Sequence, residues 1–270
     1  MKKYALFGKN IKYSISPFIH KLISDTLNKK INYKIIDVDE NKFSQKFLEF
    51  FESGGFGANI TTPFKQNAYK ACKLTTKEAE RTKVVNSLVL QKDGSFFGDN
   101  TDYRALKNHI KKINLDLYKK NVMIIGYGAT TKTLIHIIKK LKPSIITING
   151  RNIVKAKTDL DSIDYPLNFF EKSEQKIEYN VIFNCIPKTQ NKNHLINIKT
   201  TNNTCVYDLN YHRKEDSFTK WTEDKQIKEK YNGINMLVLQ AIYSWKLWHN
   251  SITEIDELQK NIIKNINEHY

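Results

Sequence analysis

Short apolar runs separated by amphipathic stretches predict strands that alternate with helices in the first hundred residues. The strands are expected at 4–8, 32–38, 56–60, 83–91 and 95–98. Between the first and second of these strands, Ile19, Leu22 and Ile23 recur at the spacing of one helical face. Between the second and third strands, the phenylalanines of 43–51 do the same. A further helix is expected from residue 101 or 102 to about 113. Strands alternating with helices predict parallel pairing within an α/β layer.

A second alternation of strands and helices begins at residue 122. Strands are expected at 122–125, at 145–148 and near 167, 181 and 205, with helices at 129–140 and 153–162. Such βαβ alternation predicts a doubly wound sheet. Two more helices, at 233–248 and 254–266, end the chain. The expected fold class is therefore α/β with two domains: an N-terminal domain on a mainly parallel sheet and a Rossmann-like doubly wound domain.

The size and charge of the chain limit its partners. A chain of 270 residues is long enough for two cores. Its net charge of +16 raises nucleic acid as a partner. The lysines, however, are scattered, and the densest basic runs read as helix faces spaced by Ile and Leu. We therefore expect a small anionic substrate and no nucleic-acid partner.

Cysteine usage and hydropathy indicate a protein of a reducing compartment. Cys72, Cys185 and Cys205 are far apart and odd in number, which argues against a disulfide framework. None of them belongs to a C-x-x-C pair or a histidine cluster, so no metal site is expected. The N-terminal apolar run is too short for a signal peptide, and no run reaches the roughly 18 apolar residues of a membrane span. We expect a cytoplasmic location without membrane attachment.

The stretch 57–65 is the first candidate site. A short strand runs towards Pro63, which favours a turn and the start of a helix. Asn59 and Thr61 are two residues apart and point to the same face of the strand. Lys65 falls in the first helical turn, where the helix dipole disfavours a cation. An amide, a hydroxyl and a lysine suit a small polyhydroxylated substrate that exchanges a proton. Taken alone, the stretch is more typical of a simple corner with a solvated lysine.

Other polar residues allow both a structural and a functional interpretation. Ser14 and Ser16 precede Pro17, so they could cap a helix or form a cradle for a carboxylate. Asp102 could cap the helix that begins near it, or pair with Lys65 and keep that lysine protonated. Two amides complete this set: Asn86 at the start of a strand and Gln240 on an apolar helix. Spacing alone does not decide between these roles.

A glycine-containing turn predicts a dinucleotide site in the second domain. Gly126 and Gly128 follow a strand and open a helix, the context in which a backbone can approach a pyrophosphate. Thr131 stands where a third glycine is usual. The next strand ends at Arg151, with Lys155 one helical turn later, where an NAD site usually has an acid. Two cations at this place favour a 2′-phosphate, so NADP is predicted over NAD.

Six motifs in one order make the chain similar to a known family. They are Ser14–Pro17, Asn59–Lys65, Asn86–Ser87, Gly98–Asp102, Asp208–Tyr211 and Gly233–Ala241. In sequence and separation they resemble the shikimate dehydrogenases, over nearly the whole chain. The resemblance implies a substrate domain formed by 1–101 and 236–270, with a Rossmann-like NADP-binding domain, 102–235, inserted between them. It also implies a monomer or a homodimer.

The resemblance assigns a role to each candidate residue. Lys65 and Asp102 would be the catalytic pair. Ser14, Ser16 and Tyr211 would hold the substrate carboxylate, and the ring hydroxyls would be bound by Asn59, Thr61, Asn86, Asp102 and Gln240. The implied cofactor contacts are Gly126, Gly128, Ala129, Arg151, Asn152, Lys155, Gly233 and Met236. The implied reaction is reversible, NADPH-dependent reduction of 3-dehydroshikimate to shikimate, in chorismate and aromatic amino-acid biosynthesis.

Departures from the family pattern cluster around the predicted cofactor site and leave alternatives open. Tyr103 and Ala105 replace usual glycines, and Gly150 replaces an asparagine. The threonine usual before Pro187 and the glycine-containing loop after it are missing, and His212 is unusual. One alternative is a quinate/shikimate dehydrogenase with relaxed cofactor use, although a serine at position 16 favours shikimate. Another is a non-catalytic dinucleotide-binding protein.

Overall fold

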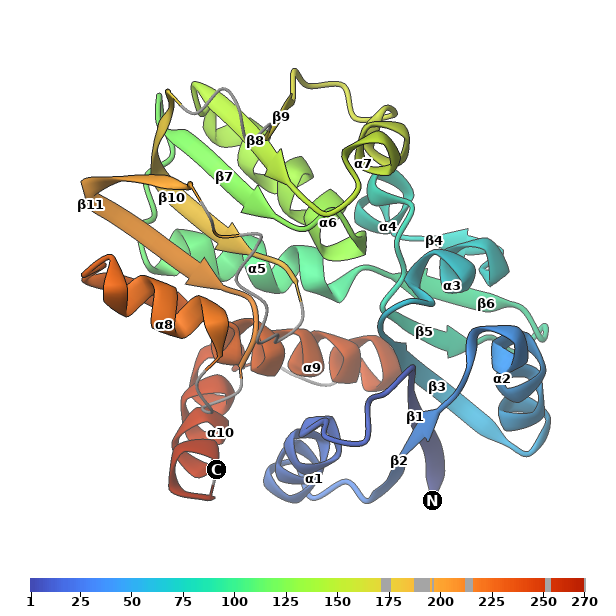
Figure 1. Cartoon of the computed structure of the whole chain (residues 1–270). Coiled ribbons are helices and arrows are strands. Elements are labelled where there is room, and N and C mark those ends of the chain that lie inside the picture. Colours follow the sequence, from blue (N-terminus) through green and yellow to red (C-terminus); the bar gives the residue numbers. More distant parts are fainter. Residues whose placement is uncertain (171–175, 187–194, 196, 212–215, 251–253, 270) are drawn as a thin grey trace. The chain divides into compact units, whose positions relative to one another are not determined.

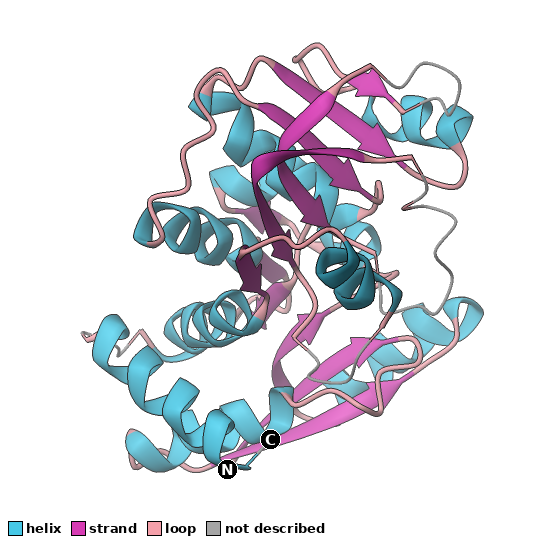
Figure 2. Ribbon diagram, turned by 60° about the vertical axis from the view of Figure 1, so that its left-hand side comes forward, coloured by secondary structure: helices cyan, strands magenta, loops and turns pink. Residues whose placement is uncertain are grey.

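The computed structural model describes residues 1–170, 176–186, 195, 197–211, 216–250 and 254–269 (Figure 1). His212 and the loop after Pro187, two of the departures above, lie outside the described residues. The chain forms two compact units, Met1–Leu106 with Asn235–Tyr270, and Lys107–Ile234. Each unit has its own sheet with helices packed on it, which confirms the predicted α/β class with a Rossmann-like part (Figure 2).

The first unit is built on a six-stranded sheet in the order β2-β1-β3-β5-β6-β4. Its strands are β1 (Lys2–Gly8), β2 (Ile31–Asp37), β3 (Gly55–Ile60), β4 (Leu74–Thr75), β5 (Ser87–Leu90) and β6 (Phe96–Asp99). The pairs β1–β2, β1–β3 and β4–β6 are parallel. Strand β5 is antiparallel to both of its neighbours, β3 and β6. The sheet is thus mainly parallel, with one reversed strand.

The helices of the first unit are α1 (Ser16–Thr26), α2 (Phe43–Glu52), α3 (Lys65–Ala71), α4 (Lys77–Thr82), α9 (Ile234–His249) and α10 (Ile255–His269). A one-turn 3₁₀ helix, Glu40–Lys42, leads into α2. Helix α5 (Thr101–Lys112) begins in this unit and ends in the other. No helix of the described residues is long and apolar enough to cross a membrane.

Alternation along β1 sends side chains to two hydrophobic layers of this sheet. Ala5 and Phe7 join a buried cluster that contains the phenylalanines of α2. Tyr4 points to the other face and packs with Trp248 of α9. The Trp248 indole Nε1 donates a hydrogen bond to the Leu88 carbonyl oxygen at 3.1 Å. A Cβ at Gly57 would lie 2.7 Å from this Nε1, so the glycine allows α9 to pack closely on the sheet.

The second unit has an entirely parallel six-stranded sheet in the order β12-β11-β10-β7-β8-β9. Its strands are β7 (Asn121–Ile125), β8 (Ile145–Asn149), β9 (Asn168–Phe169), β10 (Glu178–Asn184), β11 (Lys199–Asp208) and β12 (Glu229–Asn232). Its helices are α6 (Ala129–Ile138), which continues into a 3₁₀ turn at Lys139–Leu141, α7 (Ile153–Leu160) and α8 (Ser217–Asp224). The strand order reverses direction between β7 and β10, where doubly wound sheets bind ligands at the carboxyl ends of their strands.

Three local predictions were wrong. The helix expected to begin at Pro63 begins at Lys65, because a turn with a cis peptide bond before Pro63 precedes it. The strand expected over 83–91 covers only Ser87–Leu90, because α4 extends to Thr82 and ends at Lys83 in the left-handed conformation, and the strand begins four residues later. Helices α4 and α8 and strand β12 were not anticipated, since each is short and lacks a clear apolar period.

Candidate active site

Most of the predicted substrate residues of the first unit lie at or after the strand ends that form one edge of its sheet. The carboxyl ends of β1, β3 and β6 meet at this edge, because the two reversals around β5 restore the direction. The serine loop follows β1, Thr61 follows β3, and Asp102 comes shortly after β6. Asn86 immediately precedes the reversed strand β5, so it lies at the same edge. The topology therefore gathers residues from four separate parts of the sequence.

Lys65 and Asp102 form a buried ion pair at this edge. The Lys65 Nζ donates to the Asp102 Oδ2 at 2.7 Å, and the two side chains are only 9% and 8% exposed. Each residue lies in the first turn of its helix, α3 or α5. The carboxylate accepts from lysine, so Asp102 does more than cap a helix. A positive charge next to a helix N-terminus needs such a counter-ion, and burial makes the pairing strong and directional.

Ser16 is the first residue of helix α1 and does not cap it. The N-cap residue is Ile15, which has no side-chain cap bond. Instead the Ser14 Oγ donates to the Ser16 Oγ at 3.1 Å, and the Ser14 Oγ accepts from the backbone N–H of Ser16 at 3.2 Å. Two adjacent hydroxyls at a helix N-terminus form a polar surface suited to an anion. The capping interpretation of Ser16 therefore fails.

Asn59 and Asn86 lie in a buried hydrogen-bond network. The Asn59 Oδ1 accepts from Tyr33 Oη at 2.9 Å and pairs with His20 Nε2 at 3.1 Å. The Asn59 Nδ2 donates to the Ser244 Oγ at 2.8 Å and to the Asn86 carbonyl oxygen at 3.4 Å. All four hydrogen-bonding positions of the Asn59 amide thus have protein partners.

Thr61 and Gln240 present polar groups of a different kind. Within the part of the chain that the structure describes, the Thr61 hydroxyl has no hydrogen-bond partner, and the residue is only partly buried. The Gln240 Nε2 donates to the Leu237 carbonyl oxygen at 2.8 Å, and the residue is 8% exposed. Its side-chain oxygen lies outside this bond and can accept from a ligand.

Sequence reasoning missed His20, Tyr33 and Ser244 as partners of the site. They belong to α1, β2 and α9, and only packing brings them to Asn59. Burial lowers the pKa of His20 to about 3, because charging the ring would cost its solvation, although the bond to Asn59 opposes the shift. The signal available in the sequence was a polar residue on each of three apolar faces, which is weak evidence by itself.

In the second unit the predicted dinucleotide turn has the geometry that a pyrophosphate requires. Gly126 has a φ of +105°, and a Cβ there would lie 2.9 Å from the Ile186 side chain. No atom lies within 4 Å of a Cβ position at Gly128, the residue before α6, so the start of this helix is open. Thr131, in place of the third glycine, donates from its hydroxyl to the Gly126 carbonyl oxygen at 3.0 Å and so supports the turn. Gly126, Gly128 and Ala129 therefore fit a phosphate at the N-terminus of α6.

Exposed cations follow the next strand of this sheet. Arg151 and Lys155 are both exposed, at the beginning of α7. The Asn152 Oδ1 accepts from the Lys155 backbone N–H at 2.9 Å and so caps this helix. The Lys155 Nζ pairs with Asp159 at 2.9 Å, which raises the pKa of Lys155. The Arg151 guanidinium and the Lys155 ammonium fit a 2′-phosphate. To bind Lys155, this phosphate has to compete with the Asp159 carboxylate.

Gly150, one of the departures from the family pattern, lies against Tyr127. A Cβ at Gly150 would lie 2.6 Å from the Tyr127 ring, so this ring fills the space that a side chain at position 150 would need. Tyr127 is partly exposed between the two glycines of the turn. In the present position of the Tyr127 ring, a larger residue at 150 would require the ring to shift.

The end of β11 carries a largely buried carboxylate beside the segment of Tyr211. The Asp208 Oδ1 accepts from the Asn184 Nδ2 at 2.9 Å and from the Asn210 backbone N–H at 3.1 Å. Burial nevertheless raises the pKa of Asp208 to about 6, because the hydrogen bonds only partly offset the lost solvation. A Cβ at Gly233 would collide with the Leu209 carbonyl oxygen, so Gly233 packs tightly against this segment.

The structure places the two remaining predicted residues in different units. Met236 is buried on α9 in the first unit, and Tyr211 is partly buried in the second.

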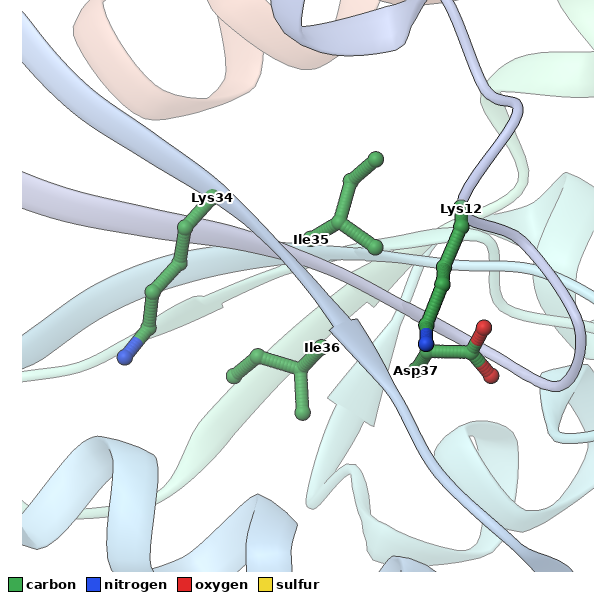
Figure 3. A pocket seen from close by; sticks show the side chains of 5 residues that line it. All are labelled: Lys12, Lys34, Ile35, Ile36 and Asp37. Atoms are coloured by element: carbon green, nitrogen blue, oxygen red, sulfur yellow. The ribbon is translucent and has the colours of Figure 1, made fainter.

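A surface pocket of about 480 Å³ lies beside β2 in the first unit (Figure 3). It is lined by Lys12, Lys34, Ile35, Ile36 and Asp37. Asp37 uses its two carboxylate oxygens to accept from the backbone N–H groups of Asn10 and Ile11. The carboxylate thereby holds the loop that leads to the serines, and none of the predicted site residues lines the pocket. Among the described residues, no group of three His, Cys, Asp or Glu side chains could hold a metal ion.

Comparison with known proteins places the chain in a family. Residues 6–88 match the family model described as the shikimate dehydrogenase substrate binding domain. A protein of Psychromonas ingrahamii named shikimate dehydrogenase (NADP(+)) is 33% identical, over 92% of this chain and 93% of its own length. Another of that name, from Buchnera aphidicola of Acyrthosiphon pisum, is 34% identical over 94% of both chains. The chain belongs to the shikimate dehydrogenase family. The family expected from the six motifs is confirmed.

Solved structures agree on the fold of this family member. Shikimate dehydrogenase 1 of Peptoclostridium difficile has a TM-score of 0.84 and is 24% identical, over 99% of this chain and 98% of its own. Shikimate 5-dehydrogenase of Thermus thermophilus, solved in complex with NADP(H) and shikimate, has a TM-score of 0.79 and is 18% identical, over 98% and 99%. At these identities the likeness extends to the fold alone.

Proposed function

We propose that this chain catalyses the reversible reduction of 3-dehydroshikimate to shikimate with NADPH. The observation that carries the proposal is the buried pair of Lys65 and Asp102, 2.7 Å apart at the polar edge of the first sheet. Membership of the shikimate dehydrogenase family and the relatives named for NADP(+) support the substrate and the cofactor.

Lys65 is the proton donor in this proposal. Bound NADPH supplies the hydride that reduces the ring carbonyl carbon. The Lys65 ammonium stabilises the negative charge that develops on the carbonyl oxygen and delivers the proton to it. Asp102 aims the ammonium, because its Oδ2 accepts one of the three lysine hydrogens. In the reverse direction the neutral lysine takes the proton of the substrate hydroxyl.

The other predicted residues orient the ring. Ser14, Ser16 and Tyr211 hold the carboxylate, and the paired hydroxyls of the two serines support this role. Thr61, Asn86, Asp102 and Gln240 contact the ring hydroxyls. Fixing the ring in one pose supplies part of the rate, because the carbonyl then faces the hydride donor without further loss of entropy.

The second unit is the NADP-binding domain of this proposal, and the first unit is the substrate domain. Gly126, Gly128 and Ala129 would receive the pyrophosphate, and Arg151, Asn152 and Lys155 the 2′-phosphate. Gly233 and Met236 would complete the cofactor site. The open start of α6 and the exposed cations of α7 support this assignment.

We further propose that the enzyme acts in the cytoplasm as a monomer or a homodimer and needs no nucleic acid. The scatter of its basic residues along the sequence supports the last point. Initial rates with shikimate or quinate, each with NADP⁺ or NAD⁺, test the proposal. Shikimate with NADP⁺ should exceed each other combination in kcat/KM by at least about tenfold. Comparable rates with NAD⁺ would overturn the cofactor assignment, and no turnover of shikimate would overturn the function.

A further inference from the structure

The amide of Asn59 can be oriented without ambiguity from its surroundings. The Asn86 backbone carbonyl can only accept, so the Nδ2 of Asn59 must face it. The Ser244 hydroxyl donates to the Gln240 carbonyl oxygen at 2.8 Å and is therefore an acceptor for the same Nδ2. The Oδ1 then faces Tyr33 and His20, and both of these must donate.

This orientation also fixes the protonation of His20. The ring carries its proton on Nε2, which donates to the Asn59 Oδ1. Its Nδ1 is buried and has no hydrogen-bond partner among the described residues. A neutral ring of this tautomer agrees with the low pKa that burial gives His20. Both lone pairs of the Asn59 Oδ1 and both hydrogens of its Nδ2 are thus used within the protein, and none is left for a ligand.

The network continues from Asn59 to the catalytic helix. The Ser244 Oγ lies 3.4 Å from the Thr101 Oγ1. Thr101 in turn has three contacts with Asn86: its backbone N–H donates to the Asn86 Oδ1 at 2.7 Å, its Oγ1 accepts from the Asn86 Nδ2 at 3.0 Å, and its Oγ1 also lies 3.1 Å from the Asn86 Oδ1. Thr101 immediately precedes Asp102, the partner of Lys65. One chain of buried polar groups therefore connects α9 and β3 with Asn86 and with the first turn of α5.

We infer that Asn59 and Ser244 are positioning residues, which hold Asn86 and the start of α5 in place for the reaction, and that Asn59 does not contact the substrate. The inference rests on the proposed function, because it concerns the geometry of the Lys65–Asp102 pair. It differs from the role expected for Asn59 by resemblance, which was a bond to a ring hydroxyl. A buried network in which the central amide, that of Asn59, uses all of its hydrogen-bonding positions rigidifies its surroundings, which is what a preorganised site requires.

Replacing the serine tests this inference against a matched control. Ser244→Ala removes the hydroxyl that joins Asn59 to Thr101. Ser87→Ala makes the same change at an equally buried serine, 0% exposed, whose Oγ has no hydrogen-bond partner among the described residues. For Ser244→Ala we expect kcat with shikimate to fall about tenfold while the KM for shikimate stays within about twofold, since a misplaced pair slows the chemical step. Ser87→Ala should keep both constants.

A second pair of variants covers the case in which Ser244→Ala does not fold. Thr101→Val keeps the shape of the side chain and removes its hydroxyl, whereas Thr101→Ser keeps the hydroxyl. Thr101→Val should lower kcat by a similar factor, and Thr101→Ser should restore most of it.

Wild-type kcat in Ser244→Ala or Thr101→Val, with only the melting temperature lowered, would overturn the inference. So would a raised KM for shikimate at unchanged kcat, which would mean that the network serves substrate binding. Failure of the proposed function is distinct, because the wild-type protein would then leave shikimate unchanged.

Discussion

The two units hold their predicted site residues in opposite ways. In the first unit these residues are mostly buried side chains that already have protein partners, as in the 2.7 Å pair of Lys65 and Asp102 and the four bonds of Asn59. In the second unit the site consists of glycine backbone at 126 and 128 and of the exposed cations Arg151 and Lys155, before and in the first turn of α7. One site is built from buried side chains, and the other from backbone geometry with exposed charges.

The contrast follows the chemistry that each site has to perform. A proton must be delivered to one oxygen atom, and this requires a side chain whose direction is fixed by burial and by a partner. Binding a dinucleotide requires charge and close approach, which helix N–H groups and glycines supply without buried side chains. Changes in the first unit should therefore act mainly on kcat, and changes in the second on cofactor affinity or on local fit.

The largest effect is expected for Lys65→Ala. Without the amine no group takes the proton of the shikimate hydroxyl during its oxidation, so kcat with shikimate should fall about a thousandfold with little change in KM. Lys73→Ala is the control, because Lys73 is an exposed lysine that pairs with Asp93 and lies outside the site. Steady-state rates of NADP⁺ reduction provide the measurement. A kcat within about threefold of the wild type would remove Lys65 from the mechanism.

Arg151→Ala tests the cofactor site of the second unit, where the affinity for the cofactor should change more than kcat. Loss of a charge-assisted contact of about 2 kcal/mol to the 2′-phosphate would raise the KM for NADP⁺ about thirtyfold and leave that for NAD⁺ and the kcat nearly unchanged. Lys157→Ala, at an exposed cation of the following helix α7, is the control. Fluorescence titration with NADP⁺ measures the affinity directly. Equal losses with both cofactors would show that Arg151 does not distinguish them.

The smallest effect concerns the fit between the two loops of the second unit. Gly150→Ala would press a methyl group against the Tyr127 ring, at 2.6 Å in the present structure, and should cost about 1–2 kcal/mol of stability. Gly128→Ala is the control, because no atom lies within 4 Å of its Cβ position. Thermal unfolding of the cofactor-free protein is the measurement.

A double variant sharpens this last test. In Tyr127→Ala the space for the methyl group exists, so adding Gly150→Ala should cost nothing further. Equal costs of Gly150→Ala in both backgrounds would mean that the ring does not constrain position 150, and that the departure from the family's asparagine has another cause.

The sequence by itself determined the two α/β patterns, the glycine turn and the family, because periodicity, turn chemistry and motif order are local properties of the chain. The short elements α4, α8 and β12 carried too little of this local signal and were missed. Sequence also named Lys65 and Asp102, but each alone was compatible with a solvated lysine or a helix cap.

Only the tertiary structure decided what these side chains contact. Lys65 and Asp102 are 37 residues apart, and Asn59 and Ser244 are 185 apart, so their bonds depend on how α5 and α9 pack on the first sheet. The same packing leaves Ser16 without a capping role and gives Asn59 a full set of protein partners. The physical reason is that a hydrogen bond needs two groups at one distance and direction, and long-range packing alone sets both.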